Sequence, residues 1–328
     1  EYGTGAVKIT PAHDPNDFEI GERHNLERIQ VIGFDGKMIN VPPQFEGLTV
    51  EEARKKVLTA LEIDEARRSE STIEHAVGRC YKCGSVIEPL IKDQWFISMQ
   101  PLAKRAIEAI ESGAIRFTPE NRGKLLINYY ENIRDWNLSR QIPWGIPIPA
   151  FQNENDPTDW IFDTRVDEKQ IVVNGTTYNR EEDTFDTWFS SGQWPYITTD
   201  ALDVDAELAK FYPNAVMETG FDILYQWVGR MIMLGLYRTN TVPFKDVYLH
   251  GMVNDEHNQK MSKSKGNVVD PLDVIDAGYG ADALRTFELF LGPINENSNW
   301  SSKGVAGVYR FLNRVWTLTQ EYIESDKQ

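Results

Sequence analysis

Hydrophobic residues along the chain follow two spacings, which predict alternating strands and helices. Short apolar runs predict strands at residues 6–10, 86–91, 215–218 and 247–250. Apolar residues three and four apart predict helices at residues 17–25, 50–61, 102–112, 122–136, 222–237, 281–291 and 304–324. Thr49 and Glu52 have the spacing of a capping box at the start of the second helix. This alternation indicates an α/β fold with a parallel sheet.

The segment between residues 142 and 186 breaks the alternation. Residues 142–151 carry three prolines, which predict an extended or looped stretch. Residues 152–186 are polar and rich in turn formers. Within them, Asn174-Gly175 is the typical pair for a two-residue hairpin turn, so a hairpin is predicted there.

Length and charge limit the classes of protein that the chain can belong to. Its 328 residues allow two or more domains. A net charge of −16 argues against a protein that coats nucleic acid indiscriminately, because phosphates demand Lys and Arg. Basic clusters at residues 67–68, 134–140 and 263–265 still allow contact with a shaped RNA. The sequence has no run of 18 apolar residues and no recognisable signal peptide, so no membrane span is predicted.

The two cysteines, Cys80 and Cys83, argue against a disulfide scaffold and fit a reducing, cytoplasmic compartment. Such a pair is half of a structural zinc site, which usually has four ligands. His75 is a candidate third ligand, but no fourth is obvious. A metal-free turn is the favoured interpretation, zinc is the alternative, and no metal ligands are assigned.

Residues 260–264 read Lys-Met-Ser-Lys-Ser and are the most informative stretch of the chain. Displacement at a phosphate needs positioning and neutralisation of charge more than covalent chemistry from the protein. Lys260 and Lys263 supply positive charge, and Ser262 and Ser264 supply hydroxyl donors. The stretch therefore predicts a mobile loop that closes over a polyphosphate. A solvated surface loop is the alternative.

Residues 218–227 predict a ligand site where a strand ends and a helix begins. Gly220 would allow close approach of a nucleotide, and Asp222 would accept hydrogen bonds from ribose hydroxyls. Ile223 and Trp227 are four residues apart, so on a regular helix they would share one face and could line an apolar pocket. The alternative is an N-capping aspartate followed by core residues.

Two tryptophan-rich segments complete the set of candidates. Residues 186–191 read Asp-Thr-Trp-Phe-Ser-Ser, so Trp188 is a candidate for ligand recognition, with core anchoring as the alternative. Residues 135–141 read Asp-Trp-Asn-Leu-Ser-Arg-Gln. Arg140 could bind phosphate or carboxylate, or form a structural ion pair.

Together these four segments resemble the class I aminoacyl-tRNA synthetases, in particular the subgroup for valine, isoleucine and leucine. The resemblance runs through nearly the whole chain and implies a Rossmann-like catalytic half. It also implies roles for individual residues. Trp188, Ile223 and Trp227 would enclose the amino-acid side chain, and the turn at Gly220 would present Asp222 to the adenylate ribose. The backbone at Met252 and Val253, after His250-Gly251, would meet adenine. Lys260 and Lys263 would hold the phosphates of ATP, together with Mg²⁺.

The amino-terminal segment at residues 3–19 resembles the end of the inserted editing domain, in a form most like the valine-specific members. Editing hydrolyses the ester between a wrong amino acid and tRNA. Valine enzymes are the standard example of the need for it, because an apolar pocket rejects the hydroxyl of threonine by only roughly 100-fold. Asp17 would anchor the substrate ammonium, while Lys8, Thr10 and Asp14 would read the hydroxyl or place water. The alternative is that Asp14 and Asn16 only cap a helix.

The resemblance divides the chain into residues 1–85, from the editing domain, 86–291, from the catalytic domain, and 292–328, the start of a helical anticodon-binding domain. The implied activity is ATP-dependent activation of L-valine and its transfer to tRNA(Val), with editing of threonyl-tRNA, by a monomer. An isoleucine-specific enzyme and a non-catalytic tRNA-binding paralogue are the alternatives.

The chain begins at Glu1 without methionine, and the family's His-x-Gly-His motif has no match in it. We therefore expect a fragment of a longer polypeptide that cannot form valyl-adenylate alone.

Overall fold

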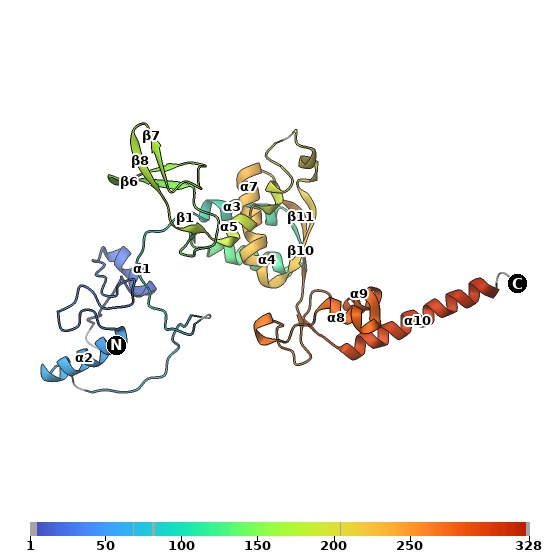
Figure 1. The fold of residues 1–328 in the computed structure, drawn as a ribbon, viewed down its shortest axis with the longest axis horizontal. Helices are drawn as coiled ribbons and strands as arrows, with labels where there is room; N and C mark the ends of the chain where they lie inside the picture. The colour runs from blue at the N-terminus through green and yellow to red at the C-terminus, as the bar shows by residue number, and fades with distance from the viewer. Residues whose placement is uncertain (1–4, 68, 81–82, 204, 326–328) are drawn as a thin grey trace. The chain divides into compact units, whose positions relative to one another are not determined.

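The structure is a computed structural model that describes residues 5–67, 69–80, 83–203 and 205–325, without the side chain of Ser264. Its chain forms two compact units, Glu1–Asp93 and Gln94–Gln328 (Figure 1). These are units of packing. The functional boundaries predicted after residues 85 and 291 stay a prediction.

The amino-terminal unit contains helices α1 (Pro15–His24) and α2 (Val50–Ile63). The predicted capping box is confirmed, because the Thr49 hydroxyl accepts from the Glu52 amide while the Glu52 carboxylate accepts from the Thr49 amide. The strand predicted at residues 6–10 is wrong: these residues have no strand partner in the described part of the unit. The Thr10 amide instead donates to the Asp17 carboxylate at 2.7 Å.

The strand predicted at residues 86–91 is also wrong. Val86 forms only an isolated antiparallel bridge with Arg79, and the rest of the stretch is irregular. A β-prone run becomes a strand only where a neighbouring backbone completes its ladder of hydrogen bonds. Isolated bridges also join Ile32 to Met38 and Lys37 to Thr49.

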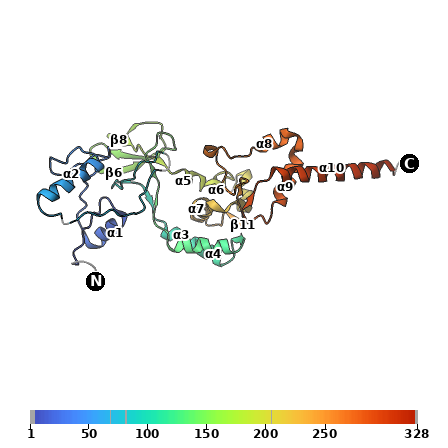
Figure 2. The ribbon, with the colours of Figure 1, turned by 90° about the horizontal axis from the view of Figure 1, so that it is seen from below.

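A parallel sheet lies at the centre of the carboxy-terminal unit and confirms the predicted fold class. Its order is β10 (Asn214–Gly220), β11 (Phe244–His250) and β2 (Arg116–Thr118), with every pairing parallel. Helices α3 (Gln100–Glu111), α4 (Asn121–Glu131) and α7 (Gly229–Thr239) belong to the layer packed with it (Figures 1 and 2). The core between them includes the fully buried residues Leu126, Tyr130, Val228, Ile232, Phe244 and Val247.

Two predicted helices end or begin differently from expectation. The helix predicted at residues 122–136 ends at Glu131, because residues 136–137 form β3 (Trp136–Asn137), which pairs with β1 (Phe96–Ile97). The helix predicted at residues 222–237 does not begin as an α-helix. It opens with a 3₁₀ turn, η2 (Phe221–Ile223), and a π-helical turn, η3 (Leu224–Val228), before α7. Asn240, in the left-handed conformation at φ 57°, ends it.

A four-stranded antiparallel sheet occupies the segment that broke the sequence pattern. Its order is β6 (Asp156–Phe162), β5 (Ala150–Asn153), β8 (Thr176–Arg180) and β7 (Gln170–Val173). The predicted hairpin joins β7 to β8. Asn174 and Gly175 have φ of 52° and 83°, as a turn with two left-handed residues requires. Nearby, β4 (Ser139–Arg140) pairs with β9 (Thr184–Phe185).

Short helices connect these sheets to one another. They are α5 (Thr187–Ser191), α6 (Trp194–Ile197) and the 3₁₀ helix η1 (Glu207–Phe211). After β11 come β12 (Val253–Asn254), the 3₁₀ turn η4 (Lys263–Lys265), α8 (Pro271–Val274), the π-helical turn η5 (Ile275–Tyr279) and α9 (Gly280–Phe290). The chain then runs through β13 (Ser298–Asn299), which pairs with β12, into α10 (Ser302–Ser325).

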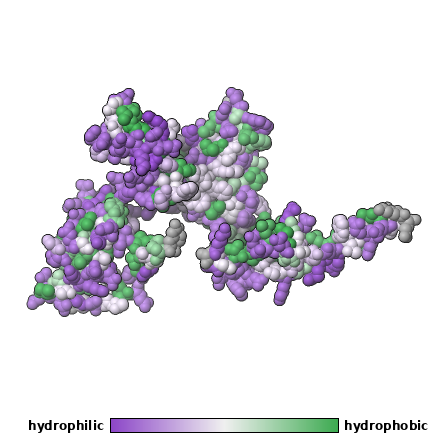
Figure 3. Space-filling view, viewed as in Figure 1, coloured by the Kyte–Doolittle hydropathy of each residue, from purple (hydrophilic) through white to green (hydrophobic). Residues whose placement is uncertain are grey.

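A second, smaller core lies under α8, α9 and α10. It contains the buried residues Val274, Leu284, Phe287, Trp300 and Val305. The surface is mostly hydrophilic on the face shown in Figure 3, with hydrophobic patches between, as the high content of acidic residues leads one to expect. Among the residues that the structure describes, none of the helices combines the length and hydrophobicity that a membrane-spanning segment needs.

Candidate functional site

The carboxyl ends of β10 and β11 lie side by side, with Gly220 in register with His250. Ligands of open α/β sheets bind beyond such ends. Asp222 lies within the turn η2, directly after β10, and its Oδ2 lies 2.9 Å from Nζ of Lys260. The segment rich in lysine thus reaches the strand ends, where the sequence predicted a nucleotide.

Residues 260–266 form what we call the lysine loop. Lys260 begins it with an isolated bridge to Asn254, and the turn η4 carries Lys263, which is exposed. Gly266 ends the turn at φ 68°, a conformation that favours glycine. The loop therefore brings Lys260 to Asp222, while Lys263 is exposed on η4.

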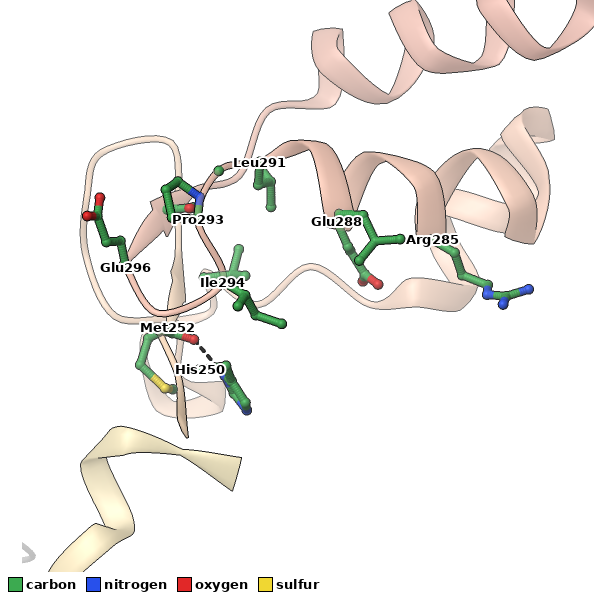
Figure 4. Close-up of a pocket in the computed structure, with 13 residues that line it drawn as sticks. His250, Met252, Arg285, Glu288, Leu291, Pro293, Ile294 and Glu296 are labelled. Atoms are coloured by element: carbon green, nitrogen blue, oxygen red, sulfur yellow. Dashed lines mark hydrogen bonds between the residues drawn. The ribbon is translucent and has the colours of Figure 1, made fainter. Parts of the chain in front are cut away.

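A cavity of about 490 Å³ opens at the end of β11, within the size range of ligand pockets. Figure 4 shows its lining, in which His250, Gly251, Met252 and Val253 face Arg285 and Glu288 of α9 and the loop at residues 292–298. Met252 and Val253, predicted to meet adenine, therefore line one cavity together with His250 and Gly251, which were also predicted to bind ATP or the adenylate. The His250 Nδ1 donates to the Gly251 carbonyl at 2.7 Å, and its Nε2 lies 3.3 Å from the Glu218 carboxylate.

Gly251 is needed for the shape of this cavity. Its amide donates to the Ile294 carbonyl at 2.7 Å, and the Met252 amide donates to Asn297 Oδ1 at 2.8 Å. A Cβ at position 251 would overlap the Glu296 carbonyl, so only glycine allows this approach of the two backbones. The Met252 amide is already bonded, and its contact with adenine stays a prediction.

The residues predicted to enclose an amino-acid side chain lie on α5, η2 and η3. Trp188 and Trp227 are half-buried against the main core, and Trp227 Nε1 donates to the Ser191 carbonyl at 3.0 Å. The argument that placed Ile223 and Trp227 on one face of a regular helix is wrong, because the 3₁₀ and π turns change the angular spacing. Their role as a pocket stays a prediction.

Asp186 is a buried carboxylate that the sequence did not single out. It accepts from Trp136 Nε1 and caps α5 through the Trp188 amide. Arg140 lies 2.9 Å and Arg230 3.5 Å from its Oδ2. Arg140 therefore forms the structural ion pair that was the alternative to a ligand contact.

Arg230 was missed because its neighbours on α7 are apolar. Its guanidinium lies 3.8 Å from the centre of the Trp136 ring, and burial lowers the pKa of Arg230. In the sequence, this cluster could have been recognised from the neighbouring aspartate and tryptophan residues at 135–136 and 186–188.

The comparisons with known proteins begin with a family model for class I tRNA synthetases (I, L, M and V), which matches residues 17–301. The chain belongs to this family. The relatives of this synthetase chain include the valine–tRNA ligase of Fusobacterium nucleatum, 41% identical over 326 residues, and that of Syntrophotalea carbinolica, 46% identical over 325 residues. Each match covers 98% of the chain but only 36% and 35% of the relative, so the chain spans about a third of their length.

Solved structures similar to the synthetase chain show its fold. The LeuRS of Agrobacterium radiobacter K84, in a ternary complex with tRNA and LeuAMS, matches with a TM-score of 0.50 at 24% identity, covering 62% of this chain and 32% of that one. The methionyl-tRNA synthetase of Mycobacterium tuberculosis, in complex with methionyl-adenylate, matches with a TM-score of 0.51 at 19% identity, covering 70% and 40%. Both support the Rossmann-like catalytic architecture.

The four residues predicted for editing lie around the start of α1 in the amino-terminal unit of this synthetase. Asp17 Oδ2 accepts from the Thr10 amide at 2.7 Å and the Thr10 hydroxyl at 3.1 Å, and Lys8 Nζ donates to that hydroxyl at 3.3 Å. The Thr10 amide is the main cause that lowers the pKa of Asp17. Asp14 accepts from the amides of residues 16 and 17 and so caps α1, whereas Asn16 lies inside the helix and does not cap it. Lys8, Thr10 and Asp17 form one connected chain.

His13 lies beside this chain and was not predicted to matter. Its Nε2 accepts from the Val31 amide at 2.9 Å, so Nδ1 carries the proton that it donates to the Pro89 carbonyl at 2.9 Å. The neutral ring thus ties three distant segments of the amino-terminal unit. In the sequence, the only sign of this role was the presence of a histidine in the Pro-Ala-His-Asp run at residues 11–14.

Cys80 and Cys83 flank residues 81 and 82, which lie outside the described ranges. Part of the turn predicted at the two cysteines therefore lies outside them too. Cys83 Sγ lies 3.4 Å from the Ser85 hydroxyl, and hydrogen bonding with Ser85 lowers the pKa of the thiol to about 7. Within the part of the chain that the structure describes, no three His, Cys, Asp or Glu side chains come together as metal ligands would. The zinc alternative stays a prediction from the sequence.

Proposed function

We propose that the chain is the central part of a valine–tRNA ligase, which activates valine with ATP and transfers it to tRNA(Val). The observation that carries the proposal is the ion pair between Lys260 and Asp222 at the ends of β10 and β11, beside the cavity at His250–Val253. The pair joins a cation suited to phosphate and a carboxylate suited to ribose. The valine–tRNA ligases among the relatives support valine as the amino acid.

The proposed reaction needs no nucleophile from the protein. A valine carboxylate oxygen attacks the α-phosphorus of ATP, the bond to the pyrophosphate oxygen breaks, and valyl-adenylate and pyrophosphate result. A ribose hydroxyl of the tRNA then attacks the acyl carbon and releases AMP. The protein therefore accelerates the reaction by orienting the substrates and by stabilising the charge that develops on the phosphates.

Each candidate residue has a role in this scheme. Asp222 accepts hydrogen bonds from the ribose hydroxyls, and the backbone at Met252 and Val253 borders adenine. Lys260 and Lys263 neutralise charge on the phosphates as pyrophosphate leaves, with hydroxyl donors from the two serines of the loop. When bound with ATP, Mg²⁺ would add to that neutralisation.

The valine side chain would lie between Trp188, Ile223 and Trp227. The half-burial of these residues on α5, η2 and η3 fits a small apolar pocket. Such a pocket cannot strongly reject threonine, which is nearly the same shape as valine. A second, hydrolytic site is therefore part of the proposal.

The amino-terminal unit would supply part of that hydrolytic site. Both bonds from Thr10 go to Oδ2 of Asp17, so Oδ1 would take the ammonium of threonyl-tRNA. Lys8 and the Thr10 hydroxyl would read the substrate hydroxyl or hold water, while Asp14 would fix the start of α1. In this proposal residues 1–85 belong to editing, 86–291 to adenylation and 292–328 to anticodon binding.

We also propose that the full-length enzyme is monomeric and cytoplasmic. The experiment is ATP–pyrophosphate exchange by this full-length enzyme with valine, isoleucine and leucine as alternative substrates. Valine should support exchange with the highest kcat/KM, and the protein should hydrolyse threonyl-tRNA(Val). Preference for isoleucine, or no exchange with any of the three, would contradict the proposal. The isolated 328-residue chain, which lacks a His-x-Gly-His motif, should not exchange above background.

A further inference from the structure

Asn267 follows the lysine loop and joins its first residues to one another. Its Oδ1 accepts a hydrogen bond from the Ser262 amide at 2.9 Å, and its Nδ2 donates to the Lys260 carbonyl at 3.3 Å. One amide side chain thus bonds the backbone on both sides of Met261, as a neighbouring strand would. This holds the backbone at the start of the loop in an extended form.

Asp255 fixes the orientation of Asn267. Its Oδ2 accepts from Asn267 Nδ2 at 2.8 Å, while its Oδ1 accepts from the amides of His257 and Gln259 at 2.9 and 2.8 Å. An ionised carboxylate only accepts, so the amide must turn its NH₂ toward Asp255 and its oxygen toward Ser262. The hydrogen bond from Asn267 is the main cause that lowers the pKa of Asp255, which keeps this acceptor ionised.

These contacts determine where the Lys260 side chain starts. The Lys260 backbone is held by Asn267 on one side and by a bridge to Asn254 on the other. From that fixed base its ammonium reaches Asp222 at 2.9 Å. Lys263 lies beyond the residues that Asn267 bonds, exposed on η4. The two lysines of the loop therefore differ: one starts from a fixed backbone and the other from an exposed turn.

We propose that Asn267 and Asp255 are positioning residues for adenylation, which hold the backbone of Lys260 and Ser262 so that the Lys260 ammonium meets the nucleotide beside Asp222. This inference rests on the proposed function. Neither side chain needs to touch the substrate. Loss of their contact would release the start of the loop, and displacement of a charged group by about 1 Å can lower a rate about 10²-fold.

The test exchanges the two side chains in the full-length enzyme. Asn267→Asp places a second carboxylate against Asp255 and removes the donor to Lys260. Adding Asp255→Asn restores the hydrogen bond between positions 255 and 267 with its direction reversed and keeps the acceptor for the Ser262 amide, while the Lys260 carbonyl stays without its donor. Asn313→Asp, which adds the same charge on the exposed face of α10, is the matched control.

Two readouts are measured for the wild type and these variants. One is ATP–pyrophosphate exchange with separate kcat and KM for ATP and for valine. The other is amide hydrogen exchange of peptides covering residues 255–267, which reports the loop whether or not the protein is active. Asn267→Asp should lower kcat/KM for ATP about 10²-fold and leave KM for valine within about twofold. It should also speed amide exchange, and the double variant should reverse both effects in part, because the contact with Asp255 and the acceptor for Ser262 return but the donor to Lys260 does not.

Several results would overturn the inference. One is unchanged amide exchange and unchanged kinetics in Asn267→Asp. Another is an equal loss of all kinetic parameters with a fall in the melting temperature and no recovery in the double variant, which would indicate a merely structural role. A wild type that exchanges with no amino acid would refute the proposed function itself. An active wild type with an unaltered loop in Asn267→Asp would refute only the positioning pair.

Discussion

Lys260 and Asp222 are 38 residues apart in sequence, yet their side chains meet, with Nζ 2.9 Å from Oδ2. The Lys260 side chain is 64% exposed and that of Asp222 33%. Pairs this exposed contribute little to stability, because water screens both charges. Under the proposed function, a nucleotide would therefore replace the contact at small cost, with ribose hydroxyls on Asp222 and phosphate on Lys260. The pair fits a site for exchange with ligand better than a structural support.

Lys260→Gln should separate these two roles in the full-length enzyme. We expect kcat/KM for ATP in pyrophosphate exchange to fall about 10²-fold, since a charge aimed at the developing phosphate charge is lost. The free energy of unfolding should change by less than about 1 kcal/mol. Lys303→Gln, on the exposed start of α10, removes the same charge and should leave exchange unaltered. Equal activity of the two variants would count against a phosphate role for Lys260.

The sequence predicted the parallel sheet and where two of its strands end because these depend on local patterns. The strands predicted at residues 215–218 and 247–250 lie within β10 and β11, which end at Gly220 and His250. The contact between Lys260 and Asp222 was not predictable in the same way, since it depends on how the lysine loop returns across the strand ends. Family resemblance placed both residues at one nucleotide, but only the fold shows that they meet directly.

Where sequence reasoning failed, tertiary contacts outweighed local preference. Residues 6–10 have the composition of a strand, yet the Thr10 amide bonds the Asp17 carboxylate and no strand lies alongside in the described part of that unit. The start of the helix predicted from residue 222 became 3₁₀ and π turns, and the spacing of apolar residues does not distinguish these from an α-helix. Only the hairpin of β7 and β8 was predicted in the four-stranded sheet. The turn between β5 and β6 lacks an Asn-Gly pair, and the pairing of β5 with β8 joins segments that are distant in sequence.

Gly251→Ala should damage the cavity at the end of β11. The added methyl group would overlap the Glu296 carbonyl, so the loop at residues 292–298 would have to move away. We expect the free energy of unfolding to fall by about 1–3 kcal/mol, and ATP binding to weaken. Denaturant unfolding and the KM for ATP are the measurements.

Gly307→Ala is the matched control for that change. A Cβ at position 307 meets nothing within 4 Å on α10, and alanine favours a helix by about 1 kcal/mol over glycine. This variant should be as stable as the wild type or more so. If the two alanine variants had the same stability, the close approach at Gly251 would be unimportant.

Asp186→Ala should destabilise the carboxy-terminal unit. It leaves Arg230, whose side chain is 14% exposed, without its carboxylate and removes the acceptor for Trp136 Nε1. Breaking a buried ion pair from one side lowers stability by about 3–5 kcal/mol, because the remaining charge stays buried. The measurement is the free energy of unfolding from denaturant titration.

Asp167→Ala is the control for Asp186, since residue 167 is an exposed aspartate in the same unit. Exposed substitutions of this kind usually change stability by no more than about 0.5 kcal/mol. A loss at Asp186 no larger than this would mean that Arg140 and Arg230 find other partners. It would also mean that the ion pairs of Asp186 with Arg140 and Arg230 do not stabilise α5, which Asp186 caps.

Asp17→Asn should lower hydrolysis of threonyl-tRNA about 10- to 100-fold, because a charged acceptor for the substrate ammonium becomes neutral. Aminoacylation with valine should not change.

The Thr10 amide lowers the pKa of Asp17 below 3.8, so its bond to the carboxylate is complete above that pH and is lost only as the pH falls through the folded-state pKa. The ratio of variant to wild-type hydrolysis should therefore be constant from about pH 5 to 8. Glu46→Gln, an exposed neutralisation in the same unit, is the control. A ratio that rises toward 1 within this window would mean that another group supplies the charge.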